Sequence, residues 1–133
     1  METVRQINDE LAVAGQVTLE QLTQLKREGF KSVLNLRLPE EQGFLNNEQQ
    51  HAESLGLYYI NIPLKVETIN DEITTYVLQQ INNLPKPIIV HCNNAMRSAV
   101  MVMMHIAMRQ GATLKQAFKQ AEQLGLLGIS PYK

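Results

Sequence analysis

The sequence predicts an α/β fold, with a mostly parallel central sheet of about four to five strands flanked by helices. Along the chain, short apolar runs alternate with segments of helical periodicity, which is typical of strand–helix–strand units with a parallel sheet. The chain has 133 residues, of which 44% are hydrophobic. That length suits one ordinary domain, and that composition can fill one core, so we expect a single domain over residues 1–133.

The first half of the chain is predicted to contain strands at residues 11–14, 32–36 and 57–62, with helices at 18–29 and 47–54. Thr18 precedes Gln21 by three residues, which is the spacing of a capping box. Leu19, Leu22 and Leu25 then share one face of the helix. The strand at 57–62 is rich in aromatic and β-branched residues, and Pro63 ends it.

The second half is predicted to contain a helix from Asn70, a strand at 87–90, a helix at 97–110 and a last helix from Thr113. The strand is a short apolar run beside a proline, so we expect it to be buried on both faces. The helix at 97–110 is apolar almost all round and should be covered on most sides. The expected buried faces of the other two helices are Ile73, Tyr76, Val77, Ile81 and Leu84, and Leu114, Ala117, Phe118, Ala121 and Leu124.

The charge balance excludes recognition of nucleic acid through a general positive field. Twelve Lys and Arg against thirteen Asp and Glu give a net charge of -1, whereas such proteins normally carry a basic excess. A single cysteine, Cys92, excludes an internal disulfide. The N-terminus has no apolar leader, and the longest nearly apolar run, 99–108, is too short to span a bilayer. We therefore expect a cytoplasmic protein that binds neither nucleic acid nor membrane.

One segment, residues 91–98, places chemistry at a strand-to-helix junction. His91 and Cys92 follow the buried strand, and Arg97 and Ser98 begin the buried helix after Asn93, Asn94, Ala95 and Met96. In such sheets ligands bind at the carboxyl ends of the strands. Backbone N–H groups at a helix N-terminus hold anions and favour a thiolate, and an arginine holds phosphate oxygens bidentately.

Ser98 is placed to donate a hydrogen bond to the sulfur, and the His91 ring could fix the loop through backbone hydrogen bonds. Taken singly, a cysteine after a buried strand is more often a small core residue, and an arginine at a helix start is more often a surface charge. Their combination at this spacing predicts an anion site. Outside this loop, Arg37 follows the second strand and so also points toward the ligand end of the sheet, although we expect a surface role for it, as for His51 and the polar string 46–50.

Several strings in the sequence resemble a known family. Residues 11–16, 29–37, 55–63 and 90–98 match, in order, segments of dual-specificity protein phosphatases. They are more similar still to the phosphatase-like domain of the bacterial beta-lactamase hydrolase-like family. The resemblance implies a cysteine-phosphatase α/β fold with no metal and no organic cofactor. It implies that Cys92 is the nucleophile, that Arg97 clamps phosphate and that Ser98 assists breakdown of a phosphocysteine.

Two features depart from that pattern. The usual phosphatase signature has five residues between cysteine and arginine, whereas four separate Cys92 from Arg97. The phosphatase-like bacterial family often carries the shorter loop, but so do rhodanese-type sulfurtransferases, whose cysteine carries a persulfide. A glycine commonly takes the place of Ala95, where an alanine forced to positive φ would be strained by roughly 1 kcal/mol or more.

The general acid of the resembled phosphatases is an aspartate on the loop after the third strand. Here Glu67 lies nearest the expected place and Asp71 is the second candidate. The leading hypothesis is a phosphatase acting on a phosphorylated small molecule or phosphoprotein. A sulfurtransferase with a persulfide on Cys92 and a non-catalytic phosphate- or sulfate-binding module remain alternatives. The natural substrate and the oligomeric state stay open.

Overall fold

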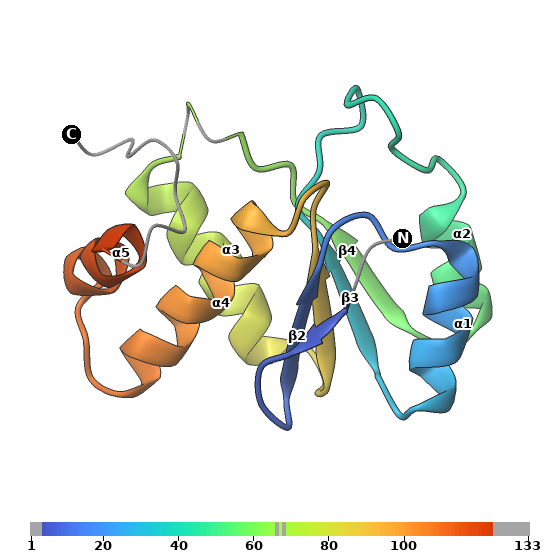
Figure 1. The fold of residues 1–133 in the computed structure, drawn as a ribbon, viewed down its shortest axis with the longest axis horizontal. Coiled ribbons are helices and arrows are strands. Elements are labelled where there is room, and N and C mark those ends of the chain that lie inside the picture. The colour runs from blue at the N-terminus through green and yellow to red at the C-terminus, as the bar shows by residue number, and fades with distance from the viewer. Residues whose placement is uncertain (1–3, 66, 68, 124–133) are drawn as a thin grey trace.

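The computed structural model describes residues 4–65, 67 and 69–123. Its sheet has five strands in the order β1-β2-β5-β3-β4 (Figure 1). The strands are β1 Arg5–Gln6, β2 Leu11–Ala14, β3 Ser32–Asn35, β4 Tyr58–Asn61 and β5 Ile88–His91. All neighbouring pairs are parallel except β1 with β2. The expected mostly parallel sheet is confirmed, and β1, which pairs only two residues at the edge, was not predicted.

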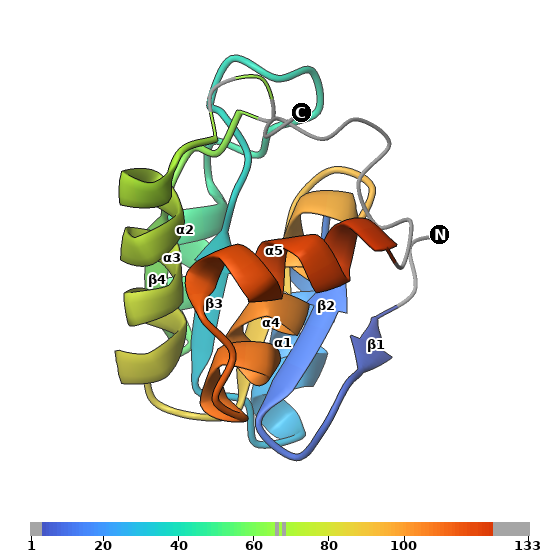
Figure 2. The same ribbon diagram turned by 90° about the vertical axis from the view of Figure 1, so that its left-hand side faces the viewer.

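Helices cover both faces of the sheet (Figures 1 and 2). Their bounds are α1 Leu19–Arg27, α2 Glu48–Ser54, α3 Asp71–Asn83, α4 Met96–Arg109 and α5 Leu114–Gln123. The short helices α1 and α2 lie on one face, and α3, α4 and α5 lie on the other, which Figure 2 views directly. The predicted α/β architecture is therefore present in the described residues.

The central strands are buried on both faces, as the apolar run at 87–90 predicted. Val90 and Leu34 pack into the core beneath α3 and α4, whereas Ile89 and Val33 pack into the core beneath α1 and α2. Alternate residues of a strand point to opposite faces. A strand whose residues pack into a core on each face of the sheet must therefore be apolar throughout, which explains the short uninterrupted apolar runs.

The helix caps also follow from the sequence. The Thr18 side chain accepts from the Gln21 amide and the Gln21 side chain accepts from the Thr18 amide, which completes the predicted capping box. Asn70 caps α3 by accepting from the Ile73 amide at 2.9 Å. Each cap satisfies N–H groups that would otherwise lack a partner in the first helical turn.

One expected core residue is exposed. Tyr76 retains 44% of its surface, because the buried stripe of α3 runs through Thr74, Val77, Leu78 and Ile81 and Tyr76 falls beside it. Ile73 and Leu84 are half-buried at its margin. In α5 the predicted Ala117, Phe118 and Ala121 are buried, and Leu124 lies outside the described residues. Among the described helices, none has the length and apolar character that crossing a membrane requires.

Candidate active site

Cys92 is held where β5 meets its two neighbours. The Cys92 amide donates to the carbonyl of Ala14 at the end of β2, at 3.2 Å, and the His91 carbonyl accepts from the Leu36 amide after β3, at 2.9 Å. The side chain is completely buried. Its Sγ lies 3.6 Å from the Ser98 hydroxyl oxygen. The predicted contact between Ser98 and the sulfur is present, at the carboxyl end of the sheet.

The Ser98 hydroxyl has three neighbours but one proton. It lies 3.0 Å from the Ala95 carbonyl and 3.2 Å from the Ala14 carbonyl, as well as beside the sulfur. A neutral thiol can donate to the hydroxyl oxygen while the hydroxyl donates to a carbonyl. Rotation about the Cβ–Oγ bond would instead direct the hydroxyl proton to a thiolate, so Ser98 suits either form of the sulfur.

The loop turns into α4 through a left-handed residue. Ala95 has φ 72°, the region in which the Cβ atom crowds the backbone. The Asn94 side chain stabilises this turn by accepting from the Met96 amide at 3.1 Å. Asn94 also forms a bridge to Gly15. The sequence-based concern about Ala95 is confirmed, and the surrounding contacts hold the strained conformation.

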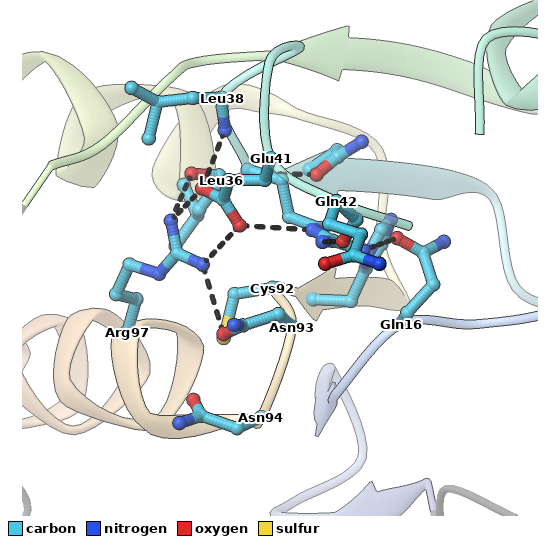
Figure 3. Close-up of polar contacts among 12 residues, drawn as sticks. Gln16, Leu36, Leu38, Glu41, Gln42, Cys92, Asn93, Asn94 and Arg97 are labelled. Carbon is cyan, nitrogen blue, oxygen red and sulfur yellow. Dashed lines mark hydrogen bonds and ion pairs between the residues drawn. The ribbon is translucent and has the colours of Figure 1, made fainter. Parts of the chain in front are cut away.

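Arg97 lies in the first turn of α4 and extends its guanidinium toward Glu41 and Asn93 (Figure 3). Nη1 donates to Glu41 Oε2 at 2.7 Å and Nη2 donates to Glu41 Oε1 at 2.9 Å, which makes a bidentate ion pair. Nη2 also donates to Asn93 Oδ1 at 3.0 Å. Nη1 has two further acceptors, the carbonyls of Leu36 at 3.3 Å and Leu64 at 3.1 Å. Both terminal nitrogens are thus engaged by oxygen atoms of the protein.

Glu41 is the charge partner that the sequence did not reveal. Beside Arg97, it accepts from the Leu38 amide at 2.8 Å and from Arg37 Nε at 3.1 Å. The Arg97 hydrogen bonds, followed by those of Leu38 and Arg37, lower the pKa of Glu41 from 4.5 to about 2 against the opposing effect of burial. In turn, Glu41 raises the pKa of Arg97, and the charge of Cys92 adds to this shift. Glu41 is therefore ionised at neutral pH.

Arg37 is buried, which makes the surface role expected for it wrong. It keeps 3% of its surface exposed. Its Nη1 donates to Gln16 Oε1 at 2.7 Å and its Nη2 to the Gln42 carbonyl at 2.6 Å. Because β3 ends just before Arg37, the side chain lies at the same sheet edge as the cysteine loop. There it links Gln16, in the loop after β2, to Glu41.

His91 is fixed by a carboxylate and not by the backbone hydrogen bonds that we expected. Its Nε2 lies 2.5 Å from Glu48 Oε2, and both side chains are completely buried. Glu48 also accepts from Gln16 Nε2 at 2.8 Å. The expected exposed surface over residues 46–50 is therefore wrong at Glu48. The N-terminus of α2 places its side chain inside the protein, toward β5.

These contacts form one continuous polar chain. It runs from Arg97 through Glu41, Arg37, Gln16 and Glu48 to His91. Its two ends are the residues that flank the cysteine loop. The loop is therefore supported by a polar network that crosses the carboxyl ends of β2, β3 and β5.

A cavity of about 470 Å³ opens beside the loop. Asn93, Asn94, Met96 and Arg97 form one wall, and Glu67 lines another part of the same cavity. Asp71, the second candidate acid, lines a different cavity with Leu114 and Phe118. The structure thus brings Glu67, but not Asp71, to the cavity that contains Arg97.

Solved structures share this fold across kingdoms. A candidate phosphatase from Shewanella putrefaciens CN-32 is 19% identical, with a TM-score of 0.73 over 87% of this chain and 75% of that chain. TpbA of P. aeruginosa gives a TM-score of 0.70 at 15% identity, over 93% of this chain and 74% of its own. The core catalytic domain of the PP-IP phosphatase SIW14 from S. cerevisiae gives 0.68 at 21% identity, over 90% and 74%.

The fold is therefore that of the cysteine-phosphatase-like α/β domains. Residues 3–114 match the family described as beta-lactamase hydrolase-like protein, phosphatase-like domain, and the chain belongs to this family. Curated relatives carry the name beta-lactamase hydrolase-like protein. The one from Agrobacterium fabrum is 33% identical over 101 residues, covering 74% of this chain and 23% of the relative. That from Xylella fastidiosa strain Temecula1 is 28% identical over 98 residues, covering 71% and 23%. The chain thus spans about a quarter of their length.

Proposed function

We propose that this domain is a cysteine-dependent phosphatase that hydrolyses phosphomonoesters through a phosphocysteine intermediate. The observation that carries the proposal is the placement of Cys92, with Ser98 Oγ 3.6 Å from its sulfur and Arg97 in the first turn of α4, at the carboxyl end of the central strand. Membership of a phosphatase-like family supports it. A Cys-to-Ser form of TpbA has been solved in complex with pTyr, which makes a phosphorylated substrate a reasonable expectation here too.

In the proposed reaction the Cys92 thiolate attacks phosphorus, an S–P bond forms and the P–O bond to the leaving group breaks. Arg97 and the amides of the loop offset the negative charge on the equatorial oxygens. Water then attacks the phosphocysteine, and the S–P bond breaks to release inorganic phosphate. Ser98 donates a hydrogen bond to the departing thiolate sulfur, and Glu67, which the first step leaves as a carboxylate, accepts the proton of the attacking water. Splitting the hydrolysis into these two steps is the advantage of a covalent nucleophile.

Substrate binding requires the loop to open. Cys92 is completely buried, and Asn93 Oδ1 accepts a hydrogen bond from Arg97 Nη2. Asn93 is itself exposed, so its side chain can leave at low cost. We propose that a phosphate oxygen replaces Asn93 Oδ1 on Arg97, while Glu41 keeps the guanidinium oriented.

Glu67 is the proposed general acid, because it is exposed and lines the cavity next to Arg97. It would give a proton to the leaving-group oxygen as the P–O bond breaks. Glu41 is nearer to Arg97, but its pKa of about 2 leaves it without a proton to donate at neutral pH. Asp71 lines another cavity and is not favoured.

The spacing of the loop favours one alternative. Four residues between Cys92 and Arg97 also suit a sulfurtransferase in which Cys92 carries a persulfide. The sulfur would then pass from Cys92 to a nucleophile such as cyanide, forming a C–S bond as the S–S bond breaks and returning the cysteine thiolate.

One experiment separates these functions. The wild-type protein and Cys92→Ser are assayed with p-nitrophenyl phosphate and, separately, with thiosulfate plus cyanide. Phosphate release that depends on Cys92 supports the phosphatase, and thiocyanate formation that depends on Cys92 supports the sulfurtransferase. Vanadate binding to both proteins and to Arg97→Ala tests the anion site alone. Activity in neither assay, with vanadate binding that depends on Arg97, would indicate a binding module.

A further inference from the structure

The cavity beside Arg97 has an unusual charge for a site that receives a phosphate. Its lining includes three carboxylates, Glu40, Glu41 and Glu67, against the two cations Arg97 and Lys65. Glu41 already occupies both terminal nitrogens of Arg97. Much of the positive charge of Arg97 is therefore balanced inside the protein before any substrate arrives.

The other two carboxylates lie toward solvent. Glu40 and Glu67 are both exposed, and Glu40, which has no part in the proposed proton transfer, presents negative charge where the parts of a substrate beyond its phosphate must lie. The cavity wall also contains apolar surface from Leu38 and Met96, which are both half-buried. Such a wall suits an uncharged or aromatic group that carries the phosphate. The exposed carboxylate of Glu40 suits positively charged groups on either side of that group.

We propose that the substrate is a phosphopeptide with an aryl phosphate and basic residues beside it. This inference rests on the proposed phosphatase function and names its substrate class. Arg97 and the loop amides receive the single phosphoryl group, the apolar wall receives the ring, and Glu40 attracts flanking Lys or Arg. A compact polyphosphorylated substrate would place its remaining phosphates against these carboxylates.

Three peptides test the preference. They share one phosphotyrosine and differ only in having Lys, Ser or Glu on both sides of it. At low salt we expect kcat/KM to fall from the Lys to the Ser to the Glu peptide, by about threefold to tenfold at each step. Near 0.5 M salt, where the Debye length is only a few Å, we expect the differences to shrink to about twofold. Inositol hexakisphosphate should be a poor substrate and a weak inhibitor.

Reversing the charge of Glu40 tests whether this residue sets the preference among the peptides. Glu40→Lys should raise kcat/KM for the Glu peptide and lower it for the Lys peptide, each by about threefold to tenfold. Glu53→Lys is the matched control, because Glu53 is an exposed residue of α2 outside the cavity lining. It makes the same change in net charge and should leave the order of the peptides unchanged.

Binding of the same peptides to Cys92→Ser, followed by fluorescence anisotropy, separates the two proposals. The order Lys, Ser, Glu in binding supports the charge preference even if no peptide is turned over, and that lack of turnover would count against the phosphatase. Equal binding of the three peptides, a preference for the Glu peptide, or no binding of any would overturn the inference. The inference is also overturned if all three are hydrolysed equally at low salt.

Discussion

Glu48 Oε2 lies 2.5 Å from Nε2 of His91, and both side chains are completely buried. His91 immediately precedes Cys92, the residue proposed as nucleophile. The pair joins the start of α2 to the end of β5, two elements 43 residues apart in the chain. A buried carboxylate is costly unless it is paired. The pair therefore makes the position of the cysteine loop depend on the docking of α2.

Removing one member of this pair should destabilise the protein strongly. We expect Glu48→Ala to lower the free energy of unfolding by about 3–5 kcal/mol, because it leaves His91 without its buried partner. Glu53→Ala in the same helix is exposed and should cost less than about 0.5 kcal/mol. Urea denaturation of both variants measures the difference. Similar losses in the two variants would contradict the importance assigned to the pair.

The strain at Ala95 predicts a stabilising substitution. Because φ is 72° at this position, Ala95→Gly should raise the free energy of unfolding by about 0.5–1 kcal/mol. Ala99→Gly makes the same chemical change within α4, where helical φ suits alanine, and should lower it by about 1 kcal/mol. Opposite shifts of the urea midpoint check the prediction. An unchanged or lower urea midpoint for Ala95→Gly would mean that the left-handed turn stores no strain.

The hydrogen bond between Asn93 and Arg97 predicts a variant that binds anions better. Asn93→Ala frees a donor on Nη2 and removes the side chain that a phosphate oxygen would replace. We expect vanadate affinity to rise about threefold to tenfold, corresponding to a lost hydrogen bond to a charged group. Alkylation of Cys92 by iodoacetamide should become faster as well.

Asn46→Ala, at an exposed turn before α2, serves as the control for Asn93→Ala and should change neither quantity. A lower vanadate affinity in Asn93→Ala would indicate that the Asn93 amide binds the anion, and that it does not occupy the position on Arg97 that the anion takes.

The ion pair of Glu41 with Arg97 predicts a pH dependence of stability. The pKa of Glu41 is lowered from 4.5 to about 2. The stability that its ionised form gives the folded protein is therefore fully present above pH 4.5 and is lost as the pH falls toward 2. Near neutral pH, Glu41→Gln should be less stable than the wild type by about 1–2 kcal/mol. Approaching about pH 2, this difference should disappear.

Glu40→Gln provides the comparison for Glu41→Gln, since Glu40 is adjacent and exposed. The free energy of unfolding of Glu40→Gln should stay within about 0.5 kcal/mol of the wild-type value at each pH. Urea denaturation across the acid range measures all three proteins. A difference between wild type and Glu41→Gln that is independent of pH would contradict an ionic contribution.

The sequence predicts the parts of this protein that depend on neighbouring residues. The capping box at Thr18 involves a spacing of three residues, and β5 is recognisable as an apolar run too short for a helix. The loop from His91 to Ser98 is continuous in the chain, so its residue types could be read together. The strain at Ala95 is expected only from the resemblance, because a glycine commonly takes that place in the related phosphatases.

The residues that support the loop could not be predicted, because their contacts are distant in sequence. Glu41 lies 56 residues before Arg97, and its loop shows no pattern that assigns it a partner. Glu48 stands in a polar string that is typical of exposed helices, and only the packing of α2 against the sheet buries it. Tyr76 shows the opposite case, where helical spacing suggests burial but no element covers that side of α3.

The position of β5 in the middle of the sheet links the chemistry to the whole fold. Its backbone is hydrogen-bonded to β2 on one side and to β3 on the other, and the Cys92 amide continues the ladder to Ala14. Amide hydrogens in such a position exchange with solvent mainly when the protein unfolds globally. Hydrogen exchange at Val90, within β5, therefore reports total stability. An inactive variant that keeps this protection has lost a chemical group, whereas one that loses it has lost the fold.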